Sequence, residues 1–520
     1  MAKARSIKSP NSDIASLPSE MRGRIINYIR AGYPGLYLVS HEEQRIDGDM
    51  KVIATELKYN LVFWSAVDGL VQTAAKGTTP TANEPMEALI AIQELPDKAI
   101  ILLRDFHLFL MDPNPVLIRQ LKDVLQRAKT QNKTLIVTGC RLCLPPELER
   151  ELTVVEFTLP GKEQLGQVLN GICESAQLQP AEGDERDQVL DAACGLTTIE
   201  AENAFALSVV ECKAINRNVV AREKAHAIKK NGLLEIIETT ESLDSIGGLE
   251  LLKEWLLQRK DAFSKRAVAY GLPTPKGVLI LGIPGTGKSL TAKATSKIFG
   301  MPLLKLDAGR IFAGLVGQSE SNLRSVIQTA EAIAPAVLWI DEIEKGFSGS
   351  KSSGATDGGT SSRVFGSFIS WMQEKKSPVF IVATANDVSQ LPPEMLRKGR
   401  FDELWFVDLP NQKEREAIWM IQIAKYRRNP KEFDTVQLAR VTDGLTGSEI
   451  ENVFVDALFK AFETGKEPTD LTVAEVLTDF VPLSKLMAEQ MSGLRQWVKG
   501  RARSATSQQQ EESRLRRLAA

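Results

Sequence analysis

The 520-residue sequence contains few of the residues that build metal centres and disulfide frameworks. It has only three histidines, and none belongs to an H-E-x-x-H pattern, which excludes a zinc protease of that type. All five cysteines lie in the first half, and their odd number argues against a disulfide framework. Cys140 and Cys143 have C-x-x-C spacing, but no second Cys or His pair follows at zinc-finger distance. We therefore expect reduced thiols and no zinc site.

Long apolar runs and an excess of one charge are also absent. No segment approaches the roughly 18 apolar residues needed to span a bilayer, and no apolar segment follows the basic N-terminus. The formal net charge of −2 gives no overall attraction to nucleic acid or anionic membranes. A cytoplasmic chain with no membrane or nucleic acid partner is therefore expected.

The second half of the chain has the alternating pattern of an α/β fold. The whole chain of 520 residues exceeds what one hydrophobic core normally supports, so at least two globular units are expected. Short apolar runs alternate with helical patterns, which is typical of a doubly wound parallel sheet; they span residues 276–281, 302–306, 336–340, 379–384 and 404–407. From Gln412 helical periodicity dominates to about Trp497, which predicts an all-α lid.

The first half repeats this order more faintly. Apolar runs at residues 35–40, 60–65, 99–103 and 134–138 precede a largely helical stretch, 164–222. After the first run, His41-Glu42-Glu43-Gln44 offers no glycine-rich loop and places two negative charges where a phosphate would lie. The matching acidic strand end is Arg104-Asp105-Phe106, with Phe106 where a catalytic glutamate would be needed. These features predict a copy of the second half that has lost nucleotide binding; an unrelated α/β domain is the alternative.

These patterns divide the chain into six segments. We expect an N-terminal tail (1–22), a degenerate α/β domain without a phosphate loop (23–163), a helical subdomain with a linker (164–232), a nucleotide-binding α/β subdomain (233–410), a helical lid (411–498) and a flexible C-terminal tail (499–520).

Residues 282–289 carry the most specific motif of the sequence. GIPGTGKS fits G-x-x-x-x-G-K-[ST] and lies between a predicted strand and a predicted helix, which favours a true phosphate loop over a glycine-rich turn. Its backbone N–H groups can close around phosphates, while Lys288 reaches the β and γ oxygens and the Ser289 hydroxyl binds Mg²⁺. The expected ATP contacts here are Pro284, Gly285, Thr286, Gly287, Lys288, Ser289 and Leu290.

Polar residues at later strand ends complete a hydrolytic set. Asp341 is expected to hold Mg²⁺ through water, and Glu342 to polarise the attacking water as general base. Asn386 ends another buried strand, where its neutral amide can position that water. Arg397 and Arg400 lie well beyond the nucleotide-contacting loops; they are either solvated surface arginines or arginines donated to a neighbouring copy.

Together these motifs resemble the AAA ATPase family in its older clade, alongside NSF, spastin and katanin. The resemblance covers about half the chain and rests on the order and spacing of DSIGG, GIPGTGKS, GQSESNLR, WIDE, ATAN and RKGRFDE. The whole chain is most similar to the conserved AAA open reading frame of cyanobacteria and algal chloroplast genomes, including its LPPEMLRKGRFDELWFVDLP run.

The resemblance implies an AAA-type P-loop fold with a helical lid, preceded by a degenerate AAA-like domain. It also implies adenine contacts at Ser245 and Gly247, a lid pair at Gly447 and Ser448, and arginines acting in trans at Arg397 and Arg400. The partners that follow are other copies of the chain in a ring, expected to be a hexamer, and a protein substrate. The location that follows is a bacterial cytosol or plastid stroma.

Two segments depart from the pattern of AAA unfoldases. The expected pore loop is Leu315-Val316-Gly317, which lacks the large contact area of an aromatic residue. The Gly/Ser-rich stretch 346–362 lies where a second pore loop would be, and its composition predicts mobility. The favoured hypothesis is a ring-forming Mg·ATP-hydrolysing motor that remodels a protein recruited through the inactive N-terminal half. An ATP-dependent assembly switch or scaffold is the alternative.

Overall fold

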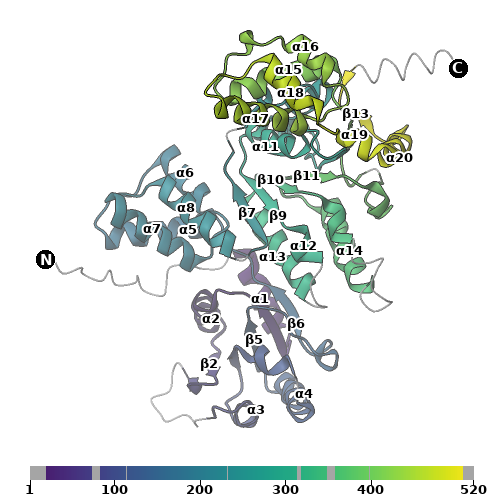
Figure 1. The fold of residues 1–520 in the computed structure, drawn as a ribbon. Helices are drawn as coiled ribbons and strands as arrows, with labels where there is room; N and C mark the ends of the chain where they lie inside the picture. The colour runs from purple at the N-terminus through teal and green to yellow at the C-terminus, as the bar shows by residue number, and fades with distance from the viewer. Residues whose placement is uncertain are drawn as a thin grey trace. The chain divides into compact units, whose positions relative to one another are not determined.

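A computed structural model describes residues 19–72, 82–112, 114–230, 232–239, 241–312, 318–347, 358–397 and 399–507. The chain forms two compact units, residues 1–227 and 228–520 (Figure 1). Each unit contains a mainly parallel sheet flanked by helices, so the predicted α/β fold class is confirmed. Among the described residues, no helix has the length and apolar content required to cross a bilayer.

The C-terminal unit is built around a sheet with the order β13-β12-β8-β11-β10-β9-β7. Its strands are β7 (Leu234–Ile237), β8 (Gly277–Gly282), β9 (Leu303–Leu306), β10 (Ala336–Ile340), β11 (Val379–Ala385), β12 (Glu403–Val407) and β13 (Arg503–Ser504). The edge strand β7 is antiparallel to β9, and the other pairs are parallel. Alternate residues of β8 enter two different cores, because successive side chains of a strand point to opposite faces.

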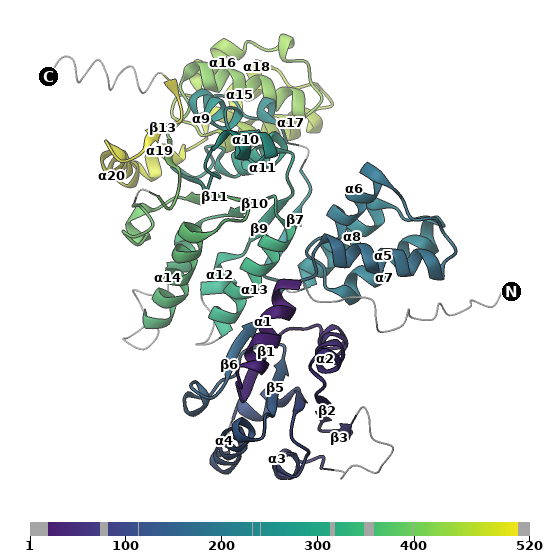
Figure 2. The same cartoon turned by 180° about the vertical axis from the view of Figure 1, so that it is seen from behind.

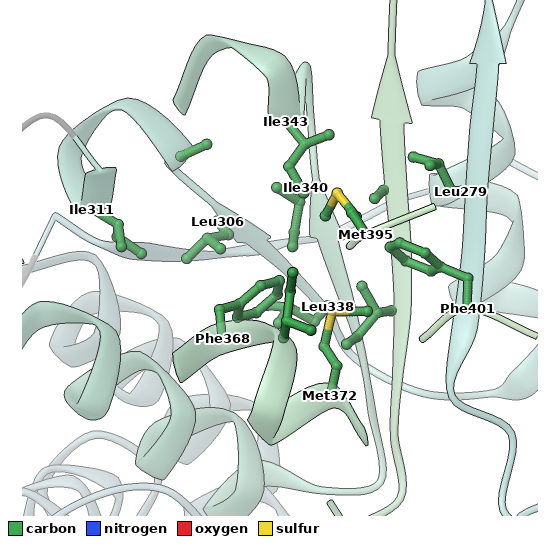
Figure 3. Packing of buried hydrophobic residues seen from close by; sticks show 14 of the residues in the cluster. Leu279, Leu306, Ile311, Leu338, Ile340, Ile343, Phe368, Met372, Met395 and Phe401 are labelled. Atoms are coloured by element: carbon green, nitrogen blue, oxygen red, sulfur yellow. The ribbon is translucent and has the colours of Figure 1, made fainter. Parts of the chain in front are cut away.

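Helices cover both faces of this sheet. On one face, Phe368 and Met372 of α14 (Gly358–Glu374) pack against Leu338 and Ile340 of β10 (Figure 3). The helices α12 (Ala308–Phe312) and α13 (Gln318–Ile333) contact each other and α14. On the other face, α9 (Glu250–Leu257) and α11 (Lys288–Phe299) lie side by side (Figure 2). Burial on both faces explains why the strands are almost continuously apolar.

The glycine- and serine-rich stretch expected to be mobile lies partly outside the described residues. Its last part, residues 358–362, forms the first turns of α14. The mobility of this part stays a prediction. The helix continues into a sequence whose apolar side chains, beginning with Val364 and Phe365, are buried in the core.

The lid is a separate helical layer with its own core. It consists of α15 (Gln412–Lys425), α16 (Thr435–Val441), α17 (Gly447–Glu463) and α18 (Asp470–Thr478), which cluster together in Figure 1. Trp419 and Phe454 are fully buried between these helices and meet edge to face. Capping boxes begin both α15 and α17, so these two helix starts are fixed by local hydrogen bonds.

The chain after the lid returns to the sheet, which corrects two predicted boundaries. Leu494, Trp497 and Val498 near the end of α20 (Ala488–Val498) pack on the core of the sheet rather than on the lid. The prediction of a flexible tail from Lys499 onward is wrong for residues 499–505, because β13 pairs with β12 and Ala505 is buried. Residues 508–520 of the expected tail lie outside the described residues.

The N-terminal unit has a sheet of order β3-β2-β4-β5-β1-β6. Its strands are β1 (Gly35–Val39), β2 (Asn60–Ser65), β3 (Gly69–Gln72), β4 (Ala99–Arg104), β5 (Thr134–Gly139) and β6 (Thr153–Glu156). Its helices are α1 (Ser19–Arg30), α2 (Glu43–Leu57), α3 (Pro85–Gln93) and α4 (Pro115–Thr130), followed by α5 (Lys162–Ser175), α6 (Gly183–Ala193), α7 (Thr198–Cys212) and α8 (Arg217–Lys230). The run β6-β1-β5-β4-β2 has the same order as β12-β8-β11-β10-β9, so the two sheets share one topology.

Candidate functional site

The loop between β8 and α11 is shaped as an anion cradle. Gly285 and Gly287 have φ angles of 80° and 91°, a left-handed conformation that favours glycine. At Gly285 a Cβ would also come within 2.9 Å of Thr446 Oγ1, so a larger residue has no room. The loop leads directly into Lys288, the first residue of α11, and the start of a helix favours negative charge.

A cavity of about 270 Å³ opens at this loop and brings most of the predicted site residues together. It is lined by the loop, the segment before α9, the ends of β10 and β11, and the start of α17. The predicted residues that line it are Ser245, Gly247, Pro284, Gly285, Thr286, Gly287, Lys288, Ser289, Leu290, Asp341, Glu342, Asn386, Gly447 and Ser448. Arg397 and Arg400 do not line it. The expected pore-loop residues Leu315, Val316 and Gly317 lie outside the described residues.

Lys288 is the buried cation of the cavity. Its Nζ donates hydrogen bonds to the carbonyl oxygens of Gly282 (2.8 Å) and Ile283 (2.7 Å). Burial lowers the pKa of Lys288 from 10.5 to about 8, against the opposing effect of Glu344, Asp341 and Glu342. The ammonium group is therefore poorly solvated and would gain from a nearby anion.

Thr384, which was not predicted as a site residue, connects the two adjacent acids. Its hydroxyl donates to Asp341 Oδ1 at 2.6 Å and accepts from the backbone N–H of Glu342 at 3.0 Å. The same Asp341 oxygen accepts from the Ser289 hydroxyl at 3.3 Å. The side chains of Asp341 and Ser289 therefore lie close together at the cavity, as is required of two residues that bind one cation.

Asn386 is held between two carboxylates. Its Nδ2 donates to Glu342 Oε1 at 3.0 Å, and its backbone N–H donates to Glu344 Oε1 at 2.9 Å. Glu342 has a left-handed backbone with φ of 48°, and its carboxylate also forms an ion pair with Lys345. Burial raises the pKa of Glu344, which the sequence did not identify as part of the site. A carboxylate and an amide therefore meet at the cavity wall opposite Lys288.

The lid touches the loop directly. The backbone N–H of Ser448 donates to the Gly285 carbonyl at 3.1 Å, and the Ser448 hydroxyl contacts the same oxygen at 3.3 Å. The capping box of α17, formed by Thr446 and Glu449, fixes the start of this helix at the cavity rim. The predicted lid pair Gly447 and Ser448 therefore lies against the loop.

Glu414, which was also not predicted, lines the cavity and joins three separate segments through hydrogen bonds. Its Oε1 accepts from the Leu249 backbone N–H (3.2 Å) and the Thr506 hydroxyl (2.8 Å), and its Oε2 accepts from the Asn411 backbone N–H (2.9 Å). At Gly248, which has φ of 81°, a Cβ would lie 2.2 Å from Glu414 Oε1. The sequence signal was the N-x-x-E capping box at Asn411, but that pattern does not indicate the two distant partners.

The donors of the cavity fit a polyphosphate with a divalent cation. The loop N–H groups and Lys288 are suited to phosphate oxygens, while Ser289 and Asp341 are hard oxygen ligands. The described residues contain no group of three or more His, Cys, Asp and Glu side chains placed to hold a metal ion. The pair Ser289 and Asp341 fits Mg²⁺, which usually takes one or two protein ligands and completes its shell with water and substrate phosphates.

The equivalent loop of the N-terminal unit is closed by a carboxylate. Glu42 is 2% exposed, and its Oε1 accepts a hydrogen bond from the backbone N–H of Thr198 at the start of α7 at 2.6 Å. Its other oxygen pairs with buried Arg45, which also donates to the Thr158 carbonyl. A fixed negative charge thus occupies the place after β1 where a phosphate would bind, in agreement with a degenerate domain.

The predicted correspondence between Phe106 and Glu342 is wrong by one residue. Asp105, and not Phe106, corresponds to Glu342: each directly precedes a five-residue 3-10 helix, and their φ angles are 53° and 48°. Phe106 is instead fully buried in the core of the N-terminal sheet, which explains why an aromatic residue follows the strand end.

Comparisons with known proteins agree with these features. A family model described as "ATPase family associated with various cellular activities (AAA)" matches residues 278–409. Models described as "SpoVK-like AAA ATPase, N-terminal domain" and "SpoVK-like AAA ATPase, second domain" match residues 21–157 and 163–231.

Similar proteins extend over nearly the whole chain. An "uncharacterized AAA domain-containing protein ycf46" of Trieres chinensis is 39% identical over 491 residues, which cover 93% of this chain and 98% of that protein. The proteins of the same description from Guillardia theta and Pyropia yezoensis are 38% and 37% identical. These alignments cover 90% and 92% of this chain and 93% and 98% of the two relatives.

Replacement of Glu414 by alanine should loosen the segment before α9 and the C-terminal strand together. The change leaves the buried Leu249 N–H without its acceptor and releases Thr506, at a cost of about 2–4 kcal/mol in stability. Hydrogen exchange should accelerate in peptides containing Leu249 and in peptides containing Thr506. Glu416→Ala, in the same helix and outside these hydrogen bonds, is the control. Unchanged exchange in both segments of Glu414→Ala would contradict the assignment.

Proposed function

The chain belongs to the AAA ATPase family, and on that premise we propose that it is a ring-forming motor that hydrolyses ATP with Mg²⁺ and remodels a protein partner. The ring is homo-oligomeric, with a hexamer as the expected size. One observation carries the proposal: Lys288, Glu342 and Asn386 surround one cavity, whereas Arg397 and Arg400 lie outside it. The site is thus complete for binding and lacks the positive charge that a neighbouring copy can supply.

The binding roles follow from the positions of the donors. The loop residues 284–290 hold the phosphates, with Lys288 on the β and γ oxygens. Ser289 would hold Mg²⁺ directly and Asp341 would hold it through water, and the ion would supply positive charge to neutralise the phosphates. Ser245 and Gly247 line the adenine end, and Gly447 and Ser448 close the cavity from the lid.

The hydrolytic step belongs to the acid and amide at the end of β10 and β11. Glu342 accepts a proton from the attacking water, and Asn386 orients both that water and the Glu342 carboxylate through its 3.0 Å hydrogen bond. Thr384 fixes the backbone of Glu342 and the side chain of Asp341, so base and cation site keep their spacing.

The exposure of Arg397 and Arg400 supports the proposal that they act in trans. Arg397 is exposed and Arg400 is partly exposed, on the segment between β11 and β12. In a ring of identical copies, such a segment can place its guanidinium groups at the cavity of the next copy. An arginine donated in this way raises phosphoryl transfer by about 10³ to 10⁵.

The remaining proposals concern the tasks of the domains, the alternative function and the location of the chain. Residues 233–410, together with the returning segment 488–505, act as the motor, and residues 411–478 act as the lid. The degenerate domain with its helical part, 23–232, recruits the partner. The absence of an aromatic residue from Leu315-Val316-Gly317 favours the alternative, an ATP-dependent assembly switch or scaffold with little threading. The relatives come from algae, and we place the chain in a bacterial cytosol or plastid stroma, without a membrane or nucleic acid partner.

Glu342→Gln should bind ATP but hydrolyse it at least about 10²-fold more slowly, because the general base is lost while the phosphate contacts remain. Negative-stain imaging with Mg·ATP should then show closed rings. Glu374→Gln, an exposed change at the end of α14, should behave as wild type. Rings without turnover in the wild-type protein would support the switch, and wild-type turnover in Glu342→Gln would remove Glu342 from its role.

Arg400→Ala should leave nucleotide affinity nearly unchanged and lower turnover by about 10³-fold or more. Since the arginine acts on a neighbouring copy, adding increasing amounts of this variant to the wild-type protein should lower the ATPase rate of the mixed rings. The specific ATPase activity of the wild-type protein alone should rise with protein concentration. Exposed Arg440→Ala in the lid is the matched control. Full activity of an isolated wild-type monomer is the outcome that would refute trans action.

ATP binding should take up a proton at alkaline pH. With a pKa of about 8, Lys288 is protonated at pH 7 but largely neutral at pH 9 to 9.5, and bound phosphate favours its charged form. Affinity should therefore fall by up to about tenfold per pH unit above pH 8. Calorimetry in buffers of different ionisation enthalpy should show uptake approaching one proton at pH 9 and little at pH 7. Lys288→Met should abolish the uptake, and Lys293→Met should retain it; pH-independent affinity in the wild type would contradict the linkage.

A further inference from the structure

The carboxyl ends of β4 and β5 carry a carboxylate and a thiol, whereas those of β10 and β11 carry a carboxylate and an amide. In the C-terminal unit, Glu342 and Asn386 follow the corresponding strands β10 and β11 and meet at 3.0 Å. In the N-terminal unit these places are taken by Asp105 and Cys140. The strand geometry that assembles a reactive edge is thus retained, with different side chains on it.

Cys140 is exposed and lies against a buried histidine. Its Sγ is 3.6 Å from Nε2 of His107, whose side chain is 2% exposed. The imidazole packs on Gly139, where an added Cβ would lie 2.4 Å from Nδ1, so the ring has little freedom to turn away. Its buried Nδ1 lies 3.7 Å from the Asp105 carboxylate.

The ring is placed to accept a proton from the thiol, and burial makes it a weaker base than a solvated imidazole. Burial lowers the pKa of His107, with Arg141 acting in the same direction and Asp105 and the Thr138 backbone opposing it. A neutral imidazole is therefore present near neutral pH, and its charged form can be stabilised by Asp105 once a proton arrives. A thiol beside such a base is more readily converted to the reactive thiolate.

Cys143 is held three residues away by a buried tyrosine. The Tyr37 hydroxyl accepts from the Cys143 backbone N–H at 3.1 Å and donates to the Arg141 carbonyl at 2.8 Å. Tyr37 is fully buried, so the turn from residue 140 to 143 is anchored to the core. Burial raises the pKa of the half-buried Cys143 more than nearby Arg141 lowers it, so Cys143 stays a thiol.

We propose that Cys140 and Cys143 form a peroxide-reactive dithiol site, with Cys140 as the attacking sulfur and Cys143 as the resolving one. An exposed thiol next to a base and a second cysteine is the arrangement that oxidant-sensing cysteines require. The site takes hydrogen peroxide or a small organic hydroperoxide.

The chemistry balances over two steps. Cys140 transfers its proton to His107, and the thiolate attacks one peroxide oxygen; the O–O bond breaks, and the departing oxygen takes the proton and leaves as water or an alcohol. The product is a sulfenic acid on Cys140. The sulfur of Cys143 then attacks that of Cys140, and its proton leaves with the hydroxyl as water. Two thiols lose two electrons in total, and the peroxide is reduced.

The test uses the full chain and its own exposed Cys212 as internal reference. After a brief, limiting dose of hydrogen peroxide, the remaining thiols are alkylated and the protein is cut after lysine. Peptide 134–162 contains both Cys140 and Cys143 and no other cysteine. It should appear two hydrogens lighter and without alkyl groups. Before oxidation, Cys140 should be alkylated at least about tenfold faster than Cys212.

Two variants separate activation from resolution. Cys143→Ser should leave the sulfenic acid on Cys140, where dimedone traps it as a stable adduct. His107→Gln should bring alkylation of Cys140 to within about threefold of Cys212. Neither assay involves ATP, so a negative result would count against the dithiol site and not against the proposed motor function. Equal alkylation of Cys140 and Cys212 in the wild-type chain would overturn the proposal, as would the absence of both the disulfide and the dimedone adduct.

Discussion

The parallel pairing of β8, β10 and β11 is the constraint on which the C-terminal site depends. Because parallel strands end at the same edge, the loop after β8, the acids after β10 and the amide after β11 converge without contact along the chain. The strands are apolar on both faces, so the sheet is held by two cores rather than by the site itself. Polar groups at the edge can therefore be arranged for chemistry at little cost to the fold.

The apolar patterns of the sequence located the central strands well, because these strands are buried on both faces. The apolar runs at residues 336–340 and 60–65 coincide with β10 and β2, since burial on both faces leaves a continuous apolar signal. Edge strands were missed: β13 is only Arg503–Ser504, and its polar side chains carry no such signal. The phosphate-loop residues and acids were predictable because their spacing is local. Thr384, Glu344 and Glu414 were not, because each acts through partners far away in the chain or through a backbone group.

The contrast between the two units lies in what holds the helical part to the loop after the first strand. In the N-terminal unit, a buried carboxylate from Glu42 accepts from the Thr198 N–H, and Arg45 neutralises it. In the C-terminal unit, neutral groups of Ser448 contact the Gly285 carbonyl. A charge-assisted hydrogen bond to a helix start is stronger than a neutral one. The first connection therefore uses a charge supplied by the protein itself, whereas the second connection uses neutral groups only.

This difference explains how one topology can serve two tasks. A helical part fixed by the protein's own carboxylate gains nothing from nucleotide, so the edge of its sheet is free to acquire other side chains. Asp105 takes the place of Glu342 with the same left-handed backbone, and Cys140 takes the place of Asn386. In the C-terminal unit the cation of Lys288 is buried, with only backbone carbonyls as hydrogen-bond partners. That unit favours an anion from outside, and such an anion would lie between the loop and the lid residues Gly447 and Ser448, which line the same cavity.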